Sequence, residues 1–289
     1  MNDQAEALRH LIRQHDPERE RKSARIITVT SGKGGVGKSN FSLNFALSLR
    51  RLGQKVLLFD ADIGMANIDV LMGRTSTYSL YHLLKQEKSI WDIIQLGSEG
   101  LHYIAGGSGF HDLIDMSESQ LNRFATEIEK LHDQYDIILF DTGAGLSKET
   151  VKFIAAAQET LVVTTPEPTS ITDAYALIKM VSGMKDVQAN FRLIVNRASN
   201  SREGKETAEK FQLVANQFLK LELPWLGMIP DDSHVSKAVK RQVPFLIAYP
   251  DCDAAAAVGG IAQSFLAIPQ SKAEGGVKGF LTKLFRLSR

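Results

Sequence analysis

Residues 30–39 read TSGKGGVGKS. They contain the pattern G-x-x-x-x-G-K-[ST], in which glycines let backbone N–H groups turn inward around phosphate oxygens. The apolar run RIITVT directly precedes this stretch, and a helical pattern follows it. A phosphate-binding loop requires this position between a strand and a helix, because the helix N-terminus adds a positive dipole end. The sequence therefore predicts a nucleotide site here rather than a glycine-rich turn without a ligand.

Two lysines of this loop have different expected roles. Lys38 completes the pattern and is expected to neutralise the β- and γ-phosphates, while the hydroxyl of Ser39 ligates Mg²⁺. Lys33 directly follows the first glycine, where the pattern does not require a cation. The predicted nucleotide-binding residues of the loop are Gly32, Lys33, Gly34, Gly35, Val36, Gly37, Lys38, Ser39 and Asn40.

Apolar runs recur along the middle of the chain and alternate with longer helical patterns such as residues 40–53. The runs are RIITVT at 25–30, KVLLFD at 55–60, LHYIA at 101–105, DIILFD at 136–141, TLVVTT at 160–165, RLIVN at 192–196 and WLGMIP at 225–230. Their β-branched and aliphatic residues do not alternate with polar ones, which is typical of strands buried on both faces. Repeated β–α units predict an α/β fold with a doubly wound, mostly parallel sheet and helices on both faces.

Aspartates end two of these runs. Asp60 and Asp62 lie at the end of one run, and Asp141 ends another. Because ligands of such sheets bind at the carboxyl ends of the strands, these side chains are expected beside the phosphate loop. A lone aspartate is more often a turn or cap residue, but three that converge on the loop favour the Walker B arrangement. The predicted metal-binding residues are Ser39, Asp62 and Asp141, the last two through water, and Asp60 or Asp62 is expected to orient the attacking water.

The base of the nucleotide is predicted to be adenine. Guanine selectivity in P-loop GTPases relies on an N-K-x-D segment after a strand, whereas here RLIVN is followed by RAS. The side chain of Asn196 can bond the adenine edge or belong to an ordinary turn. The predicted base-binding residues are Asn196, Arg197, Pro230 and Asp231, and the predicted cofactors are ATP and Mg²⁺.

The bulk composition sets limits on the class of protein. The chain has 289 residues, 44% of them hydrophobic, and a formal net charge of +1, so a large core is available and nucleic acid is an unlikely partner. The single cysteine, Cys252, excludes an internal disulfide and disfavours an iron–sulfur site within one chain. No stretch approaches the roughly 18 continuous apolar residues of a membrane span, and the polar N-terminus is no signal peptide. We therefore expect a cytoplasmic protein.

Three segments, GKGGVGKS at 32–39, DADIGMANID at 60–69 and FDTGAG at 140–145, together resemble the deviant Walker A ATPases of the MinD/ParA type. In that family the lysine that matches Lys33 reaches across a dimer to the partner's ATP. The resemblance implies an ATP-bound homodimer, with Lys33 acting like an arginine finger in trans. It also implies that Asp62 is the catalytic aspartate, assisted by Lys38 and with Asp60 beside it. The alternative for Lys33 is a solvated loop lysine.

The N-terminal segment DQAEALR at 3–9 resembles the activating motif of the FlhG group within this family. FlhG proteins regulate flagellar number and placement, and the resemblance implies an FlhF-like GTPase and flagellar C-ring proteins as partners. The predicted partner-activating residues are Asp3, Gln4, Ala5, Leu8 and Arg9. A helix this short is marginal alone, so we expect it to fold against a partner. The alternative is a helix docked on its own domain.

The last residues, VKGFLTKLFRLSR at 277–289, predict an amphipathic helix. Its apolar stripe consists of Val277, Phe280, Leu281, Leu284 and Phe285, and its cationic arc includes Lys278, Lys283 and Arg286. A basic amphipathic helix is typical of an anchor on anionic membrane surfaces, and two such helices in a dimer gain avidity. We therefore expect peripheral, reversible membrane association. The alternative is a helix packed into a groove of its own domain, which can hold in the monomeric state.

Three units are predicted along the chain. Residues 1–24 form a partner-activating helix and charged linker, residues 25–268 form the ATPase domain, and residues 269–289 form a tether plus the membrane-targeting helix. Other functions remain open: a ParA-like DNA-partitioning ATPase, a division-site MinD, a metabolic P-loop kinase or iron–sulfur carrier, and a non-enzymatic adaptor. The leading hypothesis is an ATPase switch of the FlhG kind, with slow hydrolysis that a partner stimulates.

Overall fold

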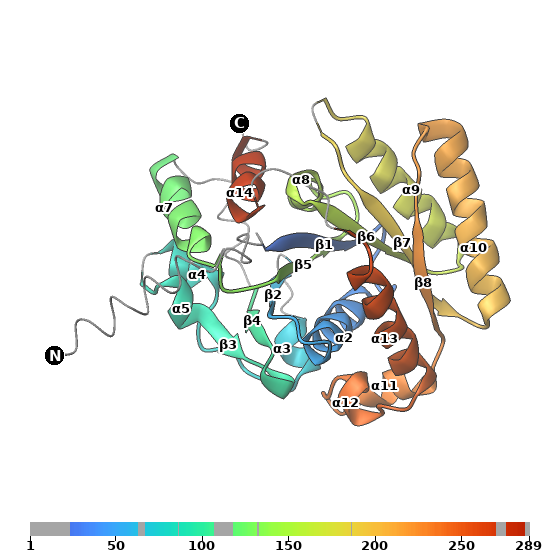
Figure 1. The fold of residues 1–289 in the computed structure, drawn as a ribbon, viewed down its shortest axis with the longest axis horizontal. Helices are drawn as coiled ribbons and strands as arrows, with labels where there is room; N and C mark the ends of the chain where they lie inside the picture. The colour runs from blue at the N-terminus through green and yellow to red at the C-terminus, as the bar shows by residue number, and fades with distance from the viewer. Residues whose placement is uncertain are drawn as a thin grey trace.

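The computed structural model describes residues 24–62, 67–85, 87–106, 118–131, 133–185, 187–269 and 276–286. These residues form an eight-stranded sheet with the order β3-β4-β2-β5-β1-β6-β7-β8, as Figure 1 shows. The strands are β1 Arg25–Ser31, β2 Val56–Ala61, β3 Ile94–Leu96, β4 His102–Ile104, β5 Ile137–Ala144, β6 Glu159–Thr164, β7 Phe191–Ala198 and β8 Trp225–Pro230. Every neighbouring pair is parallel except β3 with β4. The predicted doubly wound, mostly parallel sheet is therefore confirmed.

Helices cover both faces of this sheet (Figure 1). They are α2 Lys38–Arg51, α3 Ile68–Leu71, α4 Leu80–Leu84, α5 Ile90–Ile93, α7 Glu118–Glu129, α8 Lys148–Ala156, α9 Pro168–Ser182, α10 Ser201–Val214, α11 Ser233–Lys240, α12 Phe245–Ala248, α13 Asp253–Leu266 and α14 Gly276–Arg286. The described residues also include a 3₁₀ helix, Ser98–Gly100, and a π-helix, Ala215–Leu219. One core lies between the sheet and α2, α13, and two cores lie on the opposite face under α14, α8, α9 and α10.

The central strand β1 shows why the apolar runs do not alternate. Ile27 belongs to the core under α2, whereas Ile26 points to the opposite face and belongs to the core under α14. Both side chains are buried. A strand with helices on both faces needs apolar residues at consecutive positions, which is the pattern that the sequence carries.

Strand β3 is an element that the apolar runs did not predict. Ile94–Leu96 is three residues long, follows the one-turn helix α5 directly, and pairs antiparallel with β4 at the edge of the sheet. Leu96 is 64% exposed, so the segment lacks the continuous apolar pattern of the buried strands. A short edge strand depends on its pairing with β4 more than on its own sequence.

The first residue of β1 is anchored by a buried charge network. The guanidinium of Arg25 donates to the carboxylate of Glu159 on β6, and Arg192 on β7 donates to the other oxygen at 2.8 Å. Arg25 also lies 3.7 Å from the ring centroid of Phe265 on α13 and donates to its carbonyl at 3.3 Å. The start of β1 is therefore tied to two other strands of the sheet and to α13, which covers one of its faces.

Helix α14 packs against the domain rather than standing apart from it. Val277, Phe280, Leu281 and Leu284 are buried in the core formed with α7, α8 and the central strands. This is the arrangement that the sequence left open as an alternative to a lipid-facing stripe. The side chains of Lys278, Phe285 and Arg286 lie outside the description, and Lys283 is exposed. Among the described residues, no helix is both long and apolar enough to cross a membrane.

Candidate nucleotide site

The loop between β1 and α2 has the backbone that phosphate binding requires. Gly35 and Gly37 have φ of 80° and 89°, in the left-handed region that favours glycine, and α2 begins directly after Gly37. A β-carbon on Gly32 would lie 2.1 Å from the backbone nitrogen of Ala174 on α9. Any side chain at position 32 would therefore displace the loop from α9.

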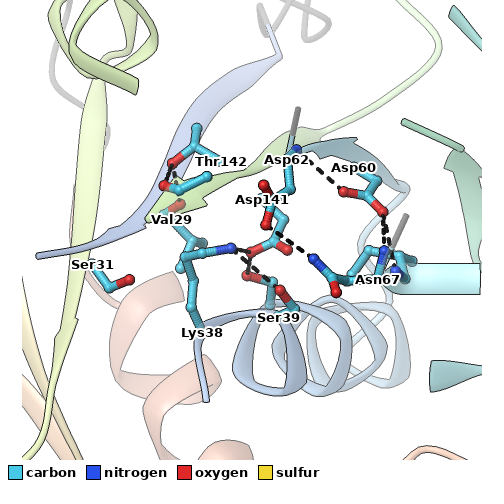
Figure 2. A network of polar contacts seen from close by, with 12 residues as sticks. Val29, Ser31, Lys38, Ser39, Asp60, Asp62, Asn67, Asp141 and Thr142 are labelled. Atoms are coloured by element: carbon cyan, nitrogen blue, oxygen red, sulfur yellow. Dashed lines mark hydrogen bonds and ion pairs between the residues drawn. The ribbon is translucent and has the colours of Figure 1, made fainter. Parts of the chain in front are cut away.

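Lys38 and Asp141 form a buried ion pair at the centre of the site, shown in Figure 2. The Nζ of Lys38 donates to Oδ1 of Asp141 at 2.9 Å, and the hydroxyl of Ser42 donates to the same oxygen at 2.7 Å. Asp141 is fully buried, and its Oδ2 has no hydrogen-bond partner among the described residues. The free oxygen lies beside Lys38, the side chain predicted to bind phosphate.

The carboxylate of Asp60 accepts hydrogen bonds from backbone nitrogens on both sides of residues 63–66. Its Oδ2 accepts hydrogen bonds from the backbone nitrogens of Asn67 at 2.8 Å and Ile68 at 3.1 Å, and its Oδ1 accepts one from Asp62 at 3.3 Å. Burial, and secondly the negative charge of Asp141, raise the pKa of Asp60 to about 7. The backbone bonds oppose this rise, because they favour the ionised form. Asp60 is therefore buried, and its carboxylate fixes the backbone at positions 62, 67 and 68.

Asp62 is the more accessible of the two aspartates. Its Oδ2 accepts a hydrogen bond from the side-chain amide of Asn67 at 3.0 Å (Figure 2). Partial burial raises the pKa of Asp62, while the positive charge of Lys38 lowers it. The two aspartates, either of which the strand-end pattern allowed to orient the water, are thus distinct: Asp60 accepts backbone hydrogen bonds, whereas Asp62 accepts one from a side chain and is less buried.

The oxygen atoms gathered here suit a hard divalent cation. Asp141 contributes a buried oxygen without a hydrogen-bond partner among the described residues, and Ser39 contributes a hydroxyl 3.2 Å from the Nζ of Lys38. Mg²⁺ prefers oxygen ligands and keeps several of its waters, so it needs few direct protein ligands. Ser39, Asp62 and Asp141 are therefore the residues that would hold the ion, the two aspartates through water.

The extra lysine of the loop contacts its own chain. The Nζ of Lys33 lies 2.5 Å from Oε2 of Glu167 and 2.8 Å from the hydroxyl of Thr169, at the start of α9. The hydrogen bond and charge of Lys33 lower the pKa of Glu167. Lys33 and Glu167 are both partly exposed, at 29% and 54% of their side chains. The ion pair is therefore accessible to solvent.

A cavity of about 420 Å³ adjoins the loop where the base is expected. Its lining includes the predicted residues Gly37, Asn40, Asn196, Arg197, Pro230 and Asp231. The side-chain nitrogen of Asn196 donates to the carbonyl of Val36 at 2.7 Å, which ties the end of β7 to the phosphate loop. Asn196 is therefore a buried brace and not an ordinary turn residue. Helix α11, which pattern reasoning did not assign to the site, contributes Val235, Ser236, Val239 and Lys240 to the same cavity.

Other features lie away from this site. A cavity of about 440 Å³ between α4, α5 and α7 contains none of the predicted site residues. The predicted partner-activating residues 3–9 lie outside the described residues. Pattern reasoning assigned no role to Ser42, Asn67, Glu167 and Thr169. Asn67 lies inside the segment DADIGMANID and Ser42 follows the phosphate loop, but nothing in the sequence pairs Lys33 with residues more than 130 positions away.

A strand, a glycine-rich loop and a helix beside converging aspartates on a parallel sheet define a P-loop NTPase. The sequence profile of the ParA family, described as a NUBPL iron-transfer P-loop NTPase, matches residues 22–266. The chain belongs to the ParA/MinD family of P-loop NTPases. The family and fold predicted from the three motifs are therefore confirmed.

Two curated relatives and two solved structures illustrate this membership. The chain is 39% identical over 238 residues to antiactivator FleN of Pseudomonas aeruginosa, covering 82% of this chain and 85% of that protein. It is 40% identical over 247 residues to the flagellum site-determining protein YlxH of Helicobacter pylori, covering 84% and 83%. MinD of Pyrococcus horikoshii complexed with Mg-ADP superposes with a TM-score of 0.69 at 27% identity, over 86% of this chain and 99% of that one. The MinC:MinD complex of Aquifex aeolicus gives 0.69 at 26% identity, over 86% and 99%.

Proposed function

We propose that this chain is an ATP-hydrolysing dimerisation switch of the FlhG kind, which regulates the number or placement of flagella. The observation that supports this most directly is its identity of 39% and 40% to two flagellar regulators, along more than four fifths of the chain. The chemistry of hydrolysis, the dimer, the membrane and the partners each have separate support in the residues.

Asn196 supports adenine as the base. Its Nδ2 is engaged by the carbonyl of Val36, so its Oδ1 is the atom that remains to contact a base in the cavity. An oxygen acceptor pairs with the 6-amino group of adenine, whereas the 6-oxo group of guanine is itself an acceptor. ATP is therefore the favoured nucleotide.

In this proposal three side chains, Lys38, Asp141 and Asp62, have separate roles in hydrolysis. Lys38 would leave Asp141 for the β- and γ-phosphates, and the freed Asp141 would face the magnesium waters. Mg²⁺, when bound, would neutralise negative charge on the phosphates. Asp62 would orient a water whose oxygen forms a bond to the γ-phosphorus as the bond to the β–γ bridging oxygen breaks. ADP and inorganic phosphate result, and the water proton passes to phosphate or carboxylate.

Lys33 and α14 would connect this chemistry to assembly. Lys33 lies at the surface, and in a dimer it would exchange Glu167 and Thr169 for the partner's nucleotide. The apolar face of α14 is covered in this chain but has the composition of an interfacial helix. ATP would then favour a state in which two copies of α14 are released together to an anionic membrane, gaining avidity.

The N-terminal segment would supply the link to partners. Residues 3–9 carry the DQAEALR motif, which in this proposal stimulates an FlhF-like GTPase. Flagellar C-ring proteins are the further partners in this scheme. Slow basal hydrolysis, stimulated by a partner, would return the protein to its monomeric state.

Sedimentation with anionic vesicles tests the switch, using the full chain and a chain that ends at Gly276, each with ATP or ADP. The full chain should pellet with ATP and the shortened chain with neither nucleotide. Phe124 on α7 lines the groove that holds Phe280, Leu281 and Leu284 of α14. Phe124→Ala should weaken this docking without changing the apolar stripe of α14, so this variant should pellet without ATP. Glu129→Gln, at an exposed position on the same helix, is the control. If the full chain and Phe124→Ala both stay in solution, the membrane part of the proposal is wrong, and ATP-dependent binding to DNA should be measured next.

A further inference from the structure

Asn67 stands at the N-cap position of α3, but its side chain does not cap that helix. An asparagine at this position ordinarily accepts a hydrogen bond from a backbone nitrogen of the first turn. Here α3 has no side-chain cap from Asn67, and Asp60 instead accepts from the backbone nitrogens of Asn67 and Ile68. The side chain of Asn67 makes a different contact, in which its amide nitrogen is the donor.

That group is the carboxylate of Asp62. The Nδ2 of Asn67 donates to Oδ2 of Asp62 at 3.0 Å, and no other side chain among the described residues donates to this carboxylate. Oδ1 of Asp62 faces Gly143 at the end of β5, where an added β-carbon would lie 3.3 Å away. Asn67 therefore fixes one oxygen of Asp62, while the other, Oδ1, accepts no hydrogen bond from a side chain among the described residues.

We propose that Asn67 is a positioning residue for hydrolysis, which holds Asp62 in the orientation that presents Oδ1 to the attacking water. The inference rests on the proposed catalytic role of Asp62. The terminal torsion of an aspartate is broad, so a carboxylate without a fixed partner samples many orientations. A single charge-assisted hydrogen bond narrows that range, and its geometry is lost if the amide is removed.

Asparagine suits this position better than its isosteres. A donor is needed, because Asp62 is an acceptor when ionised. An aspartate at position 67 would place two carboxylates at hydrogen-bond distance and turn Asp62 away. The backbone nitrogen of Asn67 is bonded to Asp60 in any variant, so the brace made by Asp60 remains when only the side chain changes.

The test is single-turnover hydrolysis of Mg-ATP by the full chain, with ATP affinity measured separately. Asn67→Ala should hydrolyse about ten- to a hundredfold more slowly, as the loss of a hydrogen bond to a charged group implies, with ATP affinity within about twofold. Asn67→Asp should be at least as slow. Asn67→Ser, which retains a donor, should recover part of the rate. Asp69→Ala is the control and should hydrolyse normally, because among the described residues the carboxylate of Asp69 accepts only from the backbone nitrogen of Val70 at the start of α3.

A double-mutant comparison separates positioning from a general structural effect. If Asn67 acts through Asp62, adding Asn67→Ala to Asp62→Ala should slow hydrolysis no further. A further tenfold loss, a loss confined to ATP affinity, or a normal rate in Asn67→Ala would each overturn the inference. If Asp62→Ala hydrolyses ATP normally, the catalytic role of Asp62 is wrong, and the positioning role of Asn67 fails with it. If Asp62→Ala is slow but Asn67→Ala is normal, only the positioning role of Asn67 is wrong.

Discussion

The ring of Phe280 on α14 stacks on the ring of Phe140 on β5, with centroids 4.8 Å apart and 19° between the planes. Phe140 immediately precedes Asp141 in the strand. Phe59, which immediately precedes Asp60, stacks on Phe140 with the same centroid distance of 4.8 Å. The C-terminal helix therefore rests on rings that adjoin both buried aspartates of the nucleotide site. The docked helix and the two strand ends are thus joined by one continuous stack of rings.

Replacing Phe280 by alanine should free α14 without unfolding the domain. Hydrogen exchange of residues 276–286 should accelerate at least about tenfold, because the helix can separate locally from the remaining core. The loss in free energy of unfolding should fall below the about 3–5 kcal/mol typical of a core phenylalanine, for the same reason. Lys283→Ala, on the exposed side of α14, serves as the control. Unchanged exchange in Phe280→Ala would contradict the observed docking.

The buried pair of Lys38 and Asp141 should govern stability as well as nucleotide binding. Lys38→Met should weaken ATP binding by at least about tenfold, because phosphate loses its cation. It should also lower the free energy of unfolding of the nucleotide-free protein by about 3 kcal/mol, since Asp141 stays buried without its ionic partner. Adding Asp141→Asn should restore much of that stability but not ATP binding. Calorimetric titration and urea denaturation measure the two effects, and a fully additive double variant would contradict the pairing.

Asp60 should make the nucleotide-free protein less stable as pH rises. Its pKa is about 7 in the folded chain against an ordinary value of 3.8. Between these values the folded state holds a proton that the unfolded state has lost, so this contribution is present at low pH and disappears as pH rises through about 7. Its size is on the order of a few kcal/mol.

The measurement for Asp60 is the free energy of unfolding from pH 5 to pH 8, compared with Asp60→Asn. The variant cannot ionise at this position, so the difference in stability between the two proteins should shift in favour of the variant as pH rises. The comparison cancels the other titrating groups. Parallel profiles would show that the pKa of Asp60 is not raised in the folded state.

Glu167→Gln should lower the protein concentration at which ATP produces dimers. The change weakens the ion pair that holds Lys33 on its own chain, and Lys33 is then more available to a second copy. Thermal stability should hardly change, because ion pairs between solvent-exposed side chains contribute little to the free energy of unfolding. Sedimentation velocity with ATP measures the shift. Glu206→Gln, which breaks an exposed pair on α10, should leave dimerisation unaltered.

The sequence predicted those parts of the molecule that local chemistry determines. The phosphate loop was found because glycines, a lysine and a serine must stand at fixed spacing, and the strands because burial on both faces demands continuous apolar runs. The convergence of Asp60 and Asp141 followed from one rule, that parallel strands end at the same edge. These two residues are indeed register partners in the sheet.

The remaining features depend on contacts between residues far apart in the chain, which the sequence alone does not reveal. An apolar stripe on α14 fits lipid or protein equally well, and only the fold shows the groove lined by Phe140 and Phe153. The contact of Lys33 with Glu167 joins segments separated by 134 positions. The difference between Asp60 and Asp62 arises from backbone nitrogens at positions 67 and 68, which no side-chain motif reveals.

The anchor at Arg25 has a consequence for the segment before it. Because Arg25 is bound to Glu159 and lies over Phe265, contacts within the domain hold the first residue of the sheet in place. We therefore expect residues 1–23 to stimulate an FlhF-like GTPase even when they are fused to an unrelated carrier protein. A graft of residues 1–23 that fails to stimulate an FlhF-like GTPase, where the full chain succeeds, would show that the two parts act as one.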